Sequence, residues 1–182
     1  MSPVLAALDV AGEPDAWRAA GFTVDDDGAI RTGALRMQSG VGTKGIADWH
    51  LAAASDTTAA LHANTTTALD HLVVFSGDPS ATVERYAALG LEPRRVRELG
   101  NGTTQTFFRA GEPIIELVGP IPDVATERFW GLAFTTSDLD ACAALLGDAL
   151  GHIKDAVQPG RRIATLRHKD VGLTVPIAFM SE

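Results

Sequence analysis

One order of secondary-structure elements recurs along the 182 residues of this sequence. Each copy begins with a short apolar strand, continues with an amphipathic helix that ends near a glycine, and finishes with three strands. The copies span residues 1–52, 69–120 and 128–180. Such repeated units bury their apolar faces against one another, so the pattern predicts an α+β protein built from βαβββ modules.

The second and third copies are the clearest. Their first strands are followed by capping residues, Asp78 in one copy and Ser137 in the other, and the helices end at Gly90 and Gly151. In the third copy the remaining strands are expected at about 152–157, 161–167 and 171–180.

The first copy is divergent, which suggests a three-part organisation. We predict an N-terminal βαβββ-like module over residues 1–52 and a linker rich in alanine and threonine over 53–68. A paired domain follows over 69–182, with modules 69–120 and 128–180. The unpaired first module is expected to cover an edge of the sheet or to pair with its counterpart in a homodimer.

Charge and cysteine content exclude several classes of protein. The chain has 15 Lys and Arg against 23 Asp and Glu, a net charge of −8. This charge repels phosphate backbones and anionic lipids, so we expect no nucleic acid and no membrane as partner. The single cysteine, Cys142, excludes a disulfide framework and a zinc site built on several cysteines. We find no signal peptide and no apolar run near the roughly 20 residues of a membrane helix, and therefore expect a cytoplasmic protein.

Three segments resemble the vicinal oxygen chelate superfamily, which includes glyoxalases, bleomycin-resistance proteins and ring-cleaving dioxygenases. Residues 69–74 (LDHLVV) resemble the opening of one module and residues 113–120 (PIIELVGP) its closing strand. Residues 132–140 (LAFTTSDLD) resemble the opening of the partner module. This resemblance to a glyoxalase-like branch covers 69–180 well and 1–52 weakly. It implies a cupped mixed sheet with a central pocket, helices on the outer face, and metal ligands from the first and last strands of each module.

His71 and Glu116 are the candidate catalytic and metal-binding residues. Strand side chains alternate between faces, so Asp70, Leu72 and Val74 should share one face, and His71 should point from the other into the pocket. Glu116 lies in the middle of an apolar strand, where a carboxylate needs a partner. An imidazole and a carboxylate are suitable ligands for a divalent metal ion. The alternative is a direct or water-bridged hydrogen-bonded pair without metal.

The partner module departs from the pattern that the resemblance implies. Its first ligand would fall at Gly131, which has no side chain, and its second near Pro176, Ile177 or Ala178, none of which can ligate through its side chain. The chain therefore offers half of the expected ligand set. Possible completions are Gln105 on a middle strand, His62 in the linker, and Asp48 or His50 in the first copy, besides a neighbouring chain. The alternatives for these residues are a sheet-surface amide, a solvated linker residue and edge-strand residues.

Other features support weaker hypotheses. Trp130, beside Gly131, lines the pocket or packs in the core. The clusters Arg94, Arg95, Arg97 and Arg161, Arg162 either bind a carboxylate or phosphate of a ligand or form solvated strand faces. The segment 39–45 (SGVGTKG) lacks the order of a phosphate-binding loop. No nucleophile elbow occurs and Cys142 lies on an apolar helical face, which argues against serine or cysteine nucleophilic catalysis.

Two functions compete at this point. The first is a divalent-metal-dependent isomerase, epimerase or lyase that acts on a small oxygen-rich substrate, in which the ion polarises substrate oxygens and Glu116 doubles as a proton-transfer base. The alternative is a metal-free protein of the bleomycin-resistance type that binds or sequesters a small molecule. Fold resemblance alone does not choose between them.

Overall fold

The computed structural model describes residues 2–182, and its centre is an eight-stranded mixed sheet. The strand order is β10-β11-β12-β9-β5-β8-β7-β6. In each half the first strand pairs in parallel with the last, β5 with β8 and β9 with β12, and the halves meet along antiparallel β5 and β9. The first half contains β5 (Thr66–Ser76), α2 (Pro79–Ala88), β6 (Pro93–Gly100), β7 (Thr103–Arg109) and β8 (Ile114–Gly119). The second contains β9 (Glu127–Thr136), α3 (Leu139–Leu146), the 3-10 turns η1 (Gly147–Ala149) and η2 (His168–Val171), β10 (Lys154–Asp155), β11 (Arg162–Thr165) and β12 (Ile177–Ser181).

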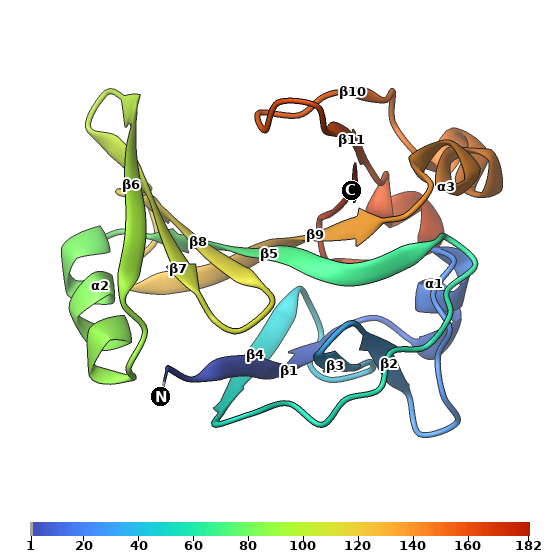
Figure 1. Ribbon diagram of the computed structural model, residues 1–182, viewed down its shortest axis with the longest axis horizontal. Helices are drawn as coiled ribbons and strands as arrows, with labels where there is room; N and C mark the ends of the chain where they lie inside the picture. The colour runs from blue at the N-terminus through green and yellow to red at the C-terminus, as the bar shows by residue number, and fades with distance from the viewer. Residues whose placement is uncertain (1) are drawn as a thin grey trace.

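The sheet is cupped, as the sequence predicts. Figure 1 shows β6 on one side and β10 and β11 on the other rising above the central strands β5 and β9. Both helices begin at an aspartate whose side chain accepts a hydrogen bond from the backbone N–H three residues on, Asp78 from Ala81 and Asp138 from Ala141. The observed cap of α3, Asp138, is therefore one residue later than the predicted Ser137. No helix among residues 2–182 combines the length and apolarity needed to cross a membrane.

The closing strand of the second half is shorter than the predicted 171–180. It begins only at Ile177, after η2 and a short connection. Gly172 adopts a left-handed conformation with φ 82°, and Pro176 has no backbone N–H to donate to a neighbouring strand. Because of these two residues, regular strand pairing begins only after Pro176.

The N-terminal residues form a second, four-stranded sheet. It contains β1 (Val4–Val10), α1 (Pro14–Ala19), β2 (Ala29–Thr32), β3 (Leu35–Gln38) and β4 (Ile46–Ala52), in the order β2-β3-β1-β4. The element order is that of the other two copies, but the pairing differs. β1 is parallel to β3 and antiparallel to β4, whereas in the large sheet the first strand of each half is parallel to the last.

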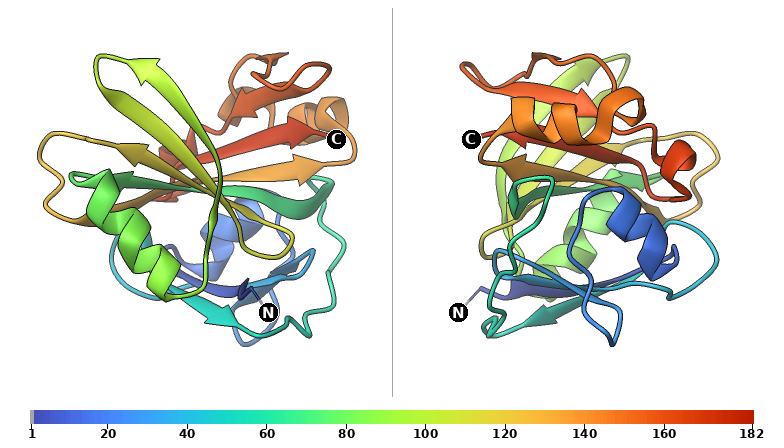
Figure 2. Two further views of the ribbon diagram at one scale, coloured as in Figure 1. Left: turned by 60° about the vertical axis from the view of Figure 1, so that its left-hand side comes forward. Right: turned by 90° about the vertical axis from the view of Figure 1, so that its right-hand side faces the viewer.

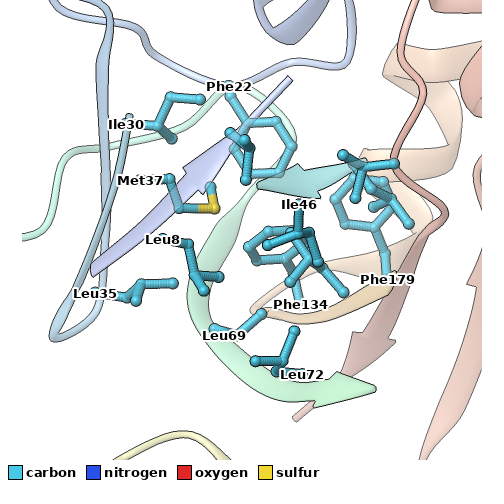
Figure 3. Close-up of a cluster of buried hydrophobic side chains, with 14 of the residues drawn as sticks. Leu8, Phe22, Ile30, Leu35, Met37, Ile46, Leu69, Leu72, Phe134 and Phe179 are labelled. Atoms are coloured by element: carbon cyan, nitrogen blue, oxygen red, sulfur yellow. The ribbon is translucent and has the colours of Figure 1, made fainter. Parts of the chain in front are cut away.

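The small sheet packs on the outer face of the large one and shares its core. Figure 2 shows it beneath the central strands, and Figure 3 shows the side chains that fill the space between the two sheets. The ring of Phe22 lies 5.0 Å from that of Phe134 on β9 and 6.1 Å from that of Phe179 on β12. Leu8 from β1 and Leu72 from β5 belong to the same buried cluster. This packing leaves the concave face of the large sheet free.

Residues 53–65 connect the two sheets and are held by specific contacts. The buried Asn64 side chain donates to the carbonyl oxygen of Ala20 (2.9 Å) and accepts from the N–H of Thr66 (3.1 Å). The Thr65 hydroxyl donates to the carbonyl oxygen of Asp138. Strand β5 starts at Thr66, three residues before the predicted strand.

Candidate functional site

His71 and Glu116 meet on the concave face of the large sheet. His71 lies on β5 opposite Ile114 of β8, and Glu116 lies one pleat along β8, opposite Val73. The side chains are 16% and 14% exposed, and His71 Nε2 is 3.5 Å from Glu116 Oε2. That separation is longer than a good hydrogen bond between these atoms. The fold brings together two residues 45 positions apart, which the sequence pattern had selected separately.

A β-bulge adds Asp70 to this site. The register pairs Leu69 with Phe134 and then His71 with Ala133, so Asp70 is an extra residue. The bulge leaves Leu69 and Leu72 both buried on the outer side, three positions apart. Asp70 lies beside His71 and not on the opposite face. The prediction from strict strand alternation was therefore wrong at this residue.

Asp70 is held as a carboxylate by two partners. Its Oδ2 is 2.8 Å from His71 Nδ1, and its Oδ1 accepts a hydrogen bond from Arg161 Nη1 at 2.6 Å. Burial alone would raise the pKa of Asp70, but the hydrogen bonds of His71 and Arg161 and the positive charge of Arg161 outweigh it and lower the pKa to about 2. Arg161 is itself anchored, because its Nε donates to the carbonyl oxygen of Ser181 at 2.7 Å.

Both arginines of the cluster Arg161, Arg162 are therefore paired with carboxylates of the same chain. Arg162 donates to both carboxylate oxygens of Asp140 on α3, at 3.1 and 2.8 Å. Arg161 and Asp70, 91 residues apart, are site residues that sequence reasoning missed as a pair. No local pattern signals their contact. The only trace in the sequence is a charged residue next to His71.

The ionised Asp70 sets the tautomer of His71. A carboxylate beside Nδ1 stabilises the proton on that nitrogen, which leaves the Nε2 lone pair directed at Glu116. Glu116 Oε1 accepts a short hydrogen bond from the Gln105 side-chain amide on β7. The Gln105 side-chain carbonyl oxygen is buried and has no hydrogen-bond partner among residues 2–182. A lone pair and a carboxylate that face each other need a proton, a water or a cation between them.

The donor atoms fit two corners of a divalent-ion site. Ligand atoms bound tetrahedrally at about 2.0–2.2 Å from one ion lie about 3.4 Å from each other, close to the 3.5 Å between His71 Nε2 and Glu116 Oε2. The side-chain carbonyl oxygen of Gln105, whose amide nitrogen donates to Glu116, is a further candidate ligand. Among residues 2–182, no group of three or more His, Cys, Asp or Glu side chains is placed to hold a metal ion.

The second half of the sheet contributes small residues where ligands would lie. The shared spacing from first strand to helix cap makes Gly131 the counterpart of His71, and the strand register makes Ala178 the counterpart of Glu116. A Cβ on Gly131 would lie 2.8 Å from the carbonyl oxygen of Pro176, so this position admits no side chain without a backbone shift. The ligand set on this chain therefore comes from one half only.

A cavity of about 190 Å³ opens beside His71. Val73, Gly131, Ala133 and Ala178 contribute to its lining, together with Trp130. The Trp130 ring is 44% exposed and stacks on Phe75 with ring centroids 4.7 Å apart, and the Arg128 guanidinium lies 5.5 Å from its centroid. Trp130 is therefore a pocket wall and not a core residue.

The remaining predicted residues lie away from this site. His62 Nδ1 accepts from the N–H of Thr23 (3.0 Å), its Nε2 donates to the carbonyl oxygen of Arg31 (3.1 Å), and its ring packs edge-on against Phe22 on the outer side of the sheet. Burial lowers the pKa of His62. The prediction of His62 as a pocket residue is corrected, because both ring nitrogens serve to fix the connecting segment.

The other weaker candidates are also accounted for. Asp48 and His50 lie on β4 of the small sheet, where His50 pairs with Asp9 at 3.0 Å. Neither reaches the concave face. Burial raises the pKa of Cys142 to about 12, so it stays a thiol in the core of α3.

Asp70→Asn provides a test of the charge at this bulge. The pKa of Asp70 is lowered from 3.8 to about 2, so the carboxylate stabilises the folded state above pH 3.8, and this contribution is lost as the pH falls toward 2. We expect the substitution to lower the free energy of unfolding by about 2 kcal/mol at pH 7. The difference from the parent protein should shrink steadily in urea titrations between pH 4 and pH 2. An equal difference at every pH would contradict this assignment.

No protein-family model matches this chain, and no curated protein matches it in sequence. Solved structures do. Methylmalonyl-CoA epimerase from Mycobacterium tuberculosis is 21% identical, with TM-score 0.51 over 64% of this chain and 89% of that chain. A variant of the Streptomyces coelicolor epimerase in complex with 2-nitronate-propionyl-CoA is 25% identical, with TM-score 0.50 over 64% of this chain and 98% of that chain. A methylmalonyl-CoA epimerase in complex with methylmalonyl-CoA and NH4+ is also 25% identical, with TM-score 0.50 over 64% of this chain and 95% of that chain.

The matched structures agree with the topology found here. Each half of the large sheet is a βαβββ module, the two modules form one cup, and the matched share of the chain equals about the length of this paired region. The segments that resemble the superfamily in sequence, around His71 and Glu116, form the first and last strands of one module. Residues 66–181 therefore have the fold of the vicinal oxygen chelate superfamily, in agreement with the resemblance of the sequence.

Proposed function

We propose that this protein is an isomerase or epimerase that moves a proton at a carbon next to a carbonyl group, with His71 and Glu116 as the reacting pair. The observation that carries the proposal is the series Arg161–Asp70–His71, in which each group fixes the next and His71 Nε2 faces Glu116, which Gln105 holds. Such a series holds one nitrogen lone pair and one carboxylate at a fixed separation above an apolar floor. This is the arrangement that general acid–base catalysis requires.

Each residue has a separate part in the proposed reaction. Asp70 keeps the proton on His71 Nδ1, so that Nε2 stays a base or a ligand. Glu116 is the second acceptor and exchanges a proton with the substrate carbon, while the Gln105 amide steadies its other oxygen. A divalent ion bound by His71 and Glu116, with Gln105 as a further ligand, would supply positive charge to a substrate oxygen.

The neighbouring structures suggest a class of substrate. Two of them are complexes with coenzyme A thioesters, one of them methylmalonyl-CoA. A carbon between a thioester and a carboxylate loses a proton readily, and the cavity of about 190 Å³ beside His71 suits a small acyl group. We therefore propose a branched acyl thioester as the substrate.

Solvent exchange tests this proposal. The protein is dialysed in turn against Mn, Co, Ni and Zn, its metal content is measured by mass spectrometry, and each form is incubated with methylmalonyl-CoA in D2O. Deuterium should enter the carbon next to the thioester, at a rate that falls after treatment with a chelator. Absence of exchange with every metal form would contradict the proposal for this substrate.

One observation favours a second function, a metal-free binding protein. The second module places Gly131 and Ala178 where a complete ligand set would need donors. If the protein only binds its ligand, the dissociation constant for methylmalonyl-CoA should be the same before and after chelation and in His71→Ala. No deuterium should then enter the bound thioester. A loss of affinity after chelation would contradict this second function.

A further inference from the structure

A second and larger cavity lies on the concave face, next to the candidate site. Its volume is about 670 Å³, against about 190 Å³ for the cavity at His71. Its walls include Arg94, Arg95, Arg97 and Arg109, the apolar side chains Phe107 and Ile114, and residues 157–159 from the connection between β10 and β11. Ile114 is the register neighbour of His71, and Phe107 is that of Glu116. The cavity therefore begins one strand position from His71 and Glu116 and runs outward over β7 and β6.

The arginines in this cavity have no carboxylate partners among residues 2–182. Arg109 donates to the carbonyl oxygen of Glu112 at 3.3 Å, and the other three guanidinium groups have no protein partner in the described chain. Most of the other arginines are paired with carboxylates; of the exceptions, Arg128 lies over aromatic rings and Arg167 donates to the carbonyl oxygen of Asp148. Six arginines lie 2.6–3.3 Å from an aspartate or glutamate: Arg18, Arg31, Arg36, Arg85, Arg161 and Arg162. This cavity is therefore a positively charged region without neutralising carboxylates among its described lining residues, in a chain whose net charge is −8.

Four like charges in one cavity repel one another unless an anion is present. Arg95 and Arg97 face the concave side because they pair with Phe107 and Gln105, whereas Glu98, opposite Thr104, alternates to the other face of β6. On β6, the arginine side chains therefore line the cavity, whereas Glu98 points away from it. Guanidinium groups bind phosphate through two parallel hydrogen bonds, so several arginines suit a ligand with several phosphate groups.

We infer that this cavity binds the phosphate-bearing nucleotide part of a coenzyme A-type thioester, an inference that rests on the proposed function. The small cavity at His71 accommodates the acyl group, and the large one, lined by arginines and by the flat ring of Phe107, accommodates the rest of the carrier. The four arginines then select phosphorylated thioesters over free acids of the same acyl group. They bind the ligand at a distance from the reacting carbon.

A binding measurement tests this inference without turnover. Adenosine 3′,5′-bisphosphate and coenzyme A are titrated calorimetrically into the parent protein, into Arg95→Gln/Arg97→Gln, and into Arg18→Gln/Arg36→Gln. The last variant removes the same charge from the N-terminal residues, far from the cavity. Both ligands should bind at least about tenfold more weakly to the cavity variant and unchanged to the control. Pantetheine, which lacks the phosphates, should bind all three proteins equally.

The outcomes separate this inference from the proposed function. If the bisphosphate does not bind the parent protein, or binds the cavity variant with parental affinity, the inference is overturned even where a thioester exchanges deuterium. If the bisphosphate binds and the cavity variant loses it, the inference stands even where no thioester exchanges deuterium. Arg97→Gln alone, checked by circular dichroism, gives the same comparison should the double variant fail to fold, with a smaller loss of affinity expected.

Discussion

The substitution His71→Ala should lower the rate of deuterium exchange into the thioester about a thousandfold. The expected size follows from the loss of a positioned acid–base group, which typically contributes between about 10²- and 10⁴-fold. The alanine also removes one of two donor atoms placed to hold a divalent ion, so metal content measured by mass spectrometry should fall in parallel. Glu116→Gln, which keeps the shape of the side chain, should lose activity to a similar extent.

A histidine outside the site provides the control for this prediction. His152 is exposed, in the connection after η1, and His152→Ala should exchange deuterium at the parental rate. Circular dichroism should show that both histidine variants are folded, because His71 lies on the concave face and not in the shared core. Parental activity in His71→Ala would remove this residue from the proposed mechanism.

The largest effect on stability is expected from Phe134→Ala. Phe134 is fully buried on β9 and contacts Phe22 from the N-terminal residues and Phe179 from β12, at 5.0 and 6.3 Å between ring centroids. Truncating a ring at such a position leaves a cavity and costs about 3–5 kcal/mol of the free energy of unfolding. Urea denaturation followed by tryptophan fluorescence measures this loss.

Phe75→Ala is the matched control, because the same truncation is made on the concave face. Phe75 stacks on the exposed Trp130 at the pocket wall, so a loss of only about 1–2 kcal/mol is expected. In both variants fluorescence and far-ultraviolet circular dichroism should report one transition, since the two sheets share a core. Two separate transitions would show that the N-terminal sheet folds independently.

The paired modules follow from local patterns, whereas the details of the site depend on long-range geometry. Apolar strands and helix-ending glycines repeat at a fixed spacing, so the paired modules are accessible to sequence reasoning. A glutamate in an apolar strand is conspicuous, whereas the cup and the meeting of Glu116 with His71 are expected from the resemblance to the superfamily. The bulge at Asp70 is not, because a single extra residue changes the face of the strand without changing its composition.

The contact of Arg161 with Asp70 likewise cannot be predicted from local sequence patterns. The partner of Arg161 lies 91 residues away, and two adjacent arginines are compatible with a ligand site but are more often a solvated strand face. His62 illustrates the opposite case, in which a residue type suited to metal binding serves to fix the backbone of a connecting segment. The parallel partner of β1 also depends on packing, because β1 lies between β3, to which it is parallel, and β4, to which it is antiparallel.

The proposed reacting and ligating residues all lie on one half of the large sheet, and this affects which parts of the pocket can change in sequence. The proposed reacting groups lie on β5 and β8, whereas β9 and β12 line the pocket with residues that carry no ionisable side chain: Trp130, Gly131, Leu132, Ala133, Ile177 and Ala178. Natural variation in that second half can reshape the pocket without altering the chemistry, so substrate range and reaction type are free to evolve separately. The two positions are not equally open to change. The contact with Pro176 closes Gly131 to a larger residue unless the backbone shifts, which leaves Ala178 as the position where a donor side chain could be introduced.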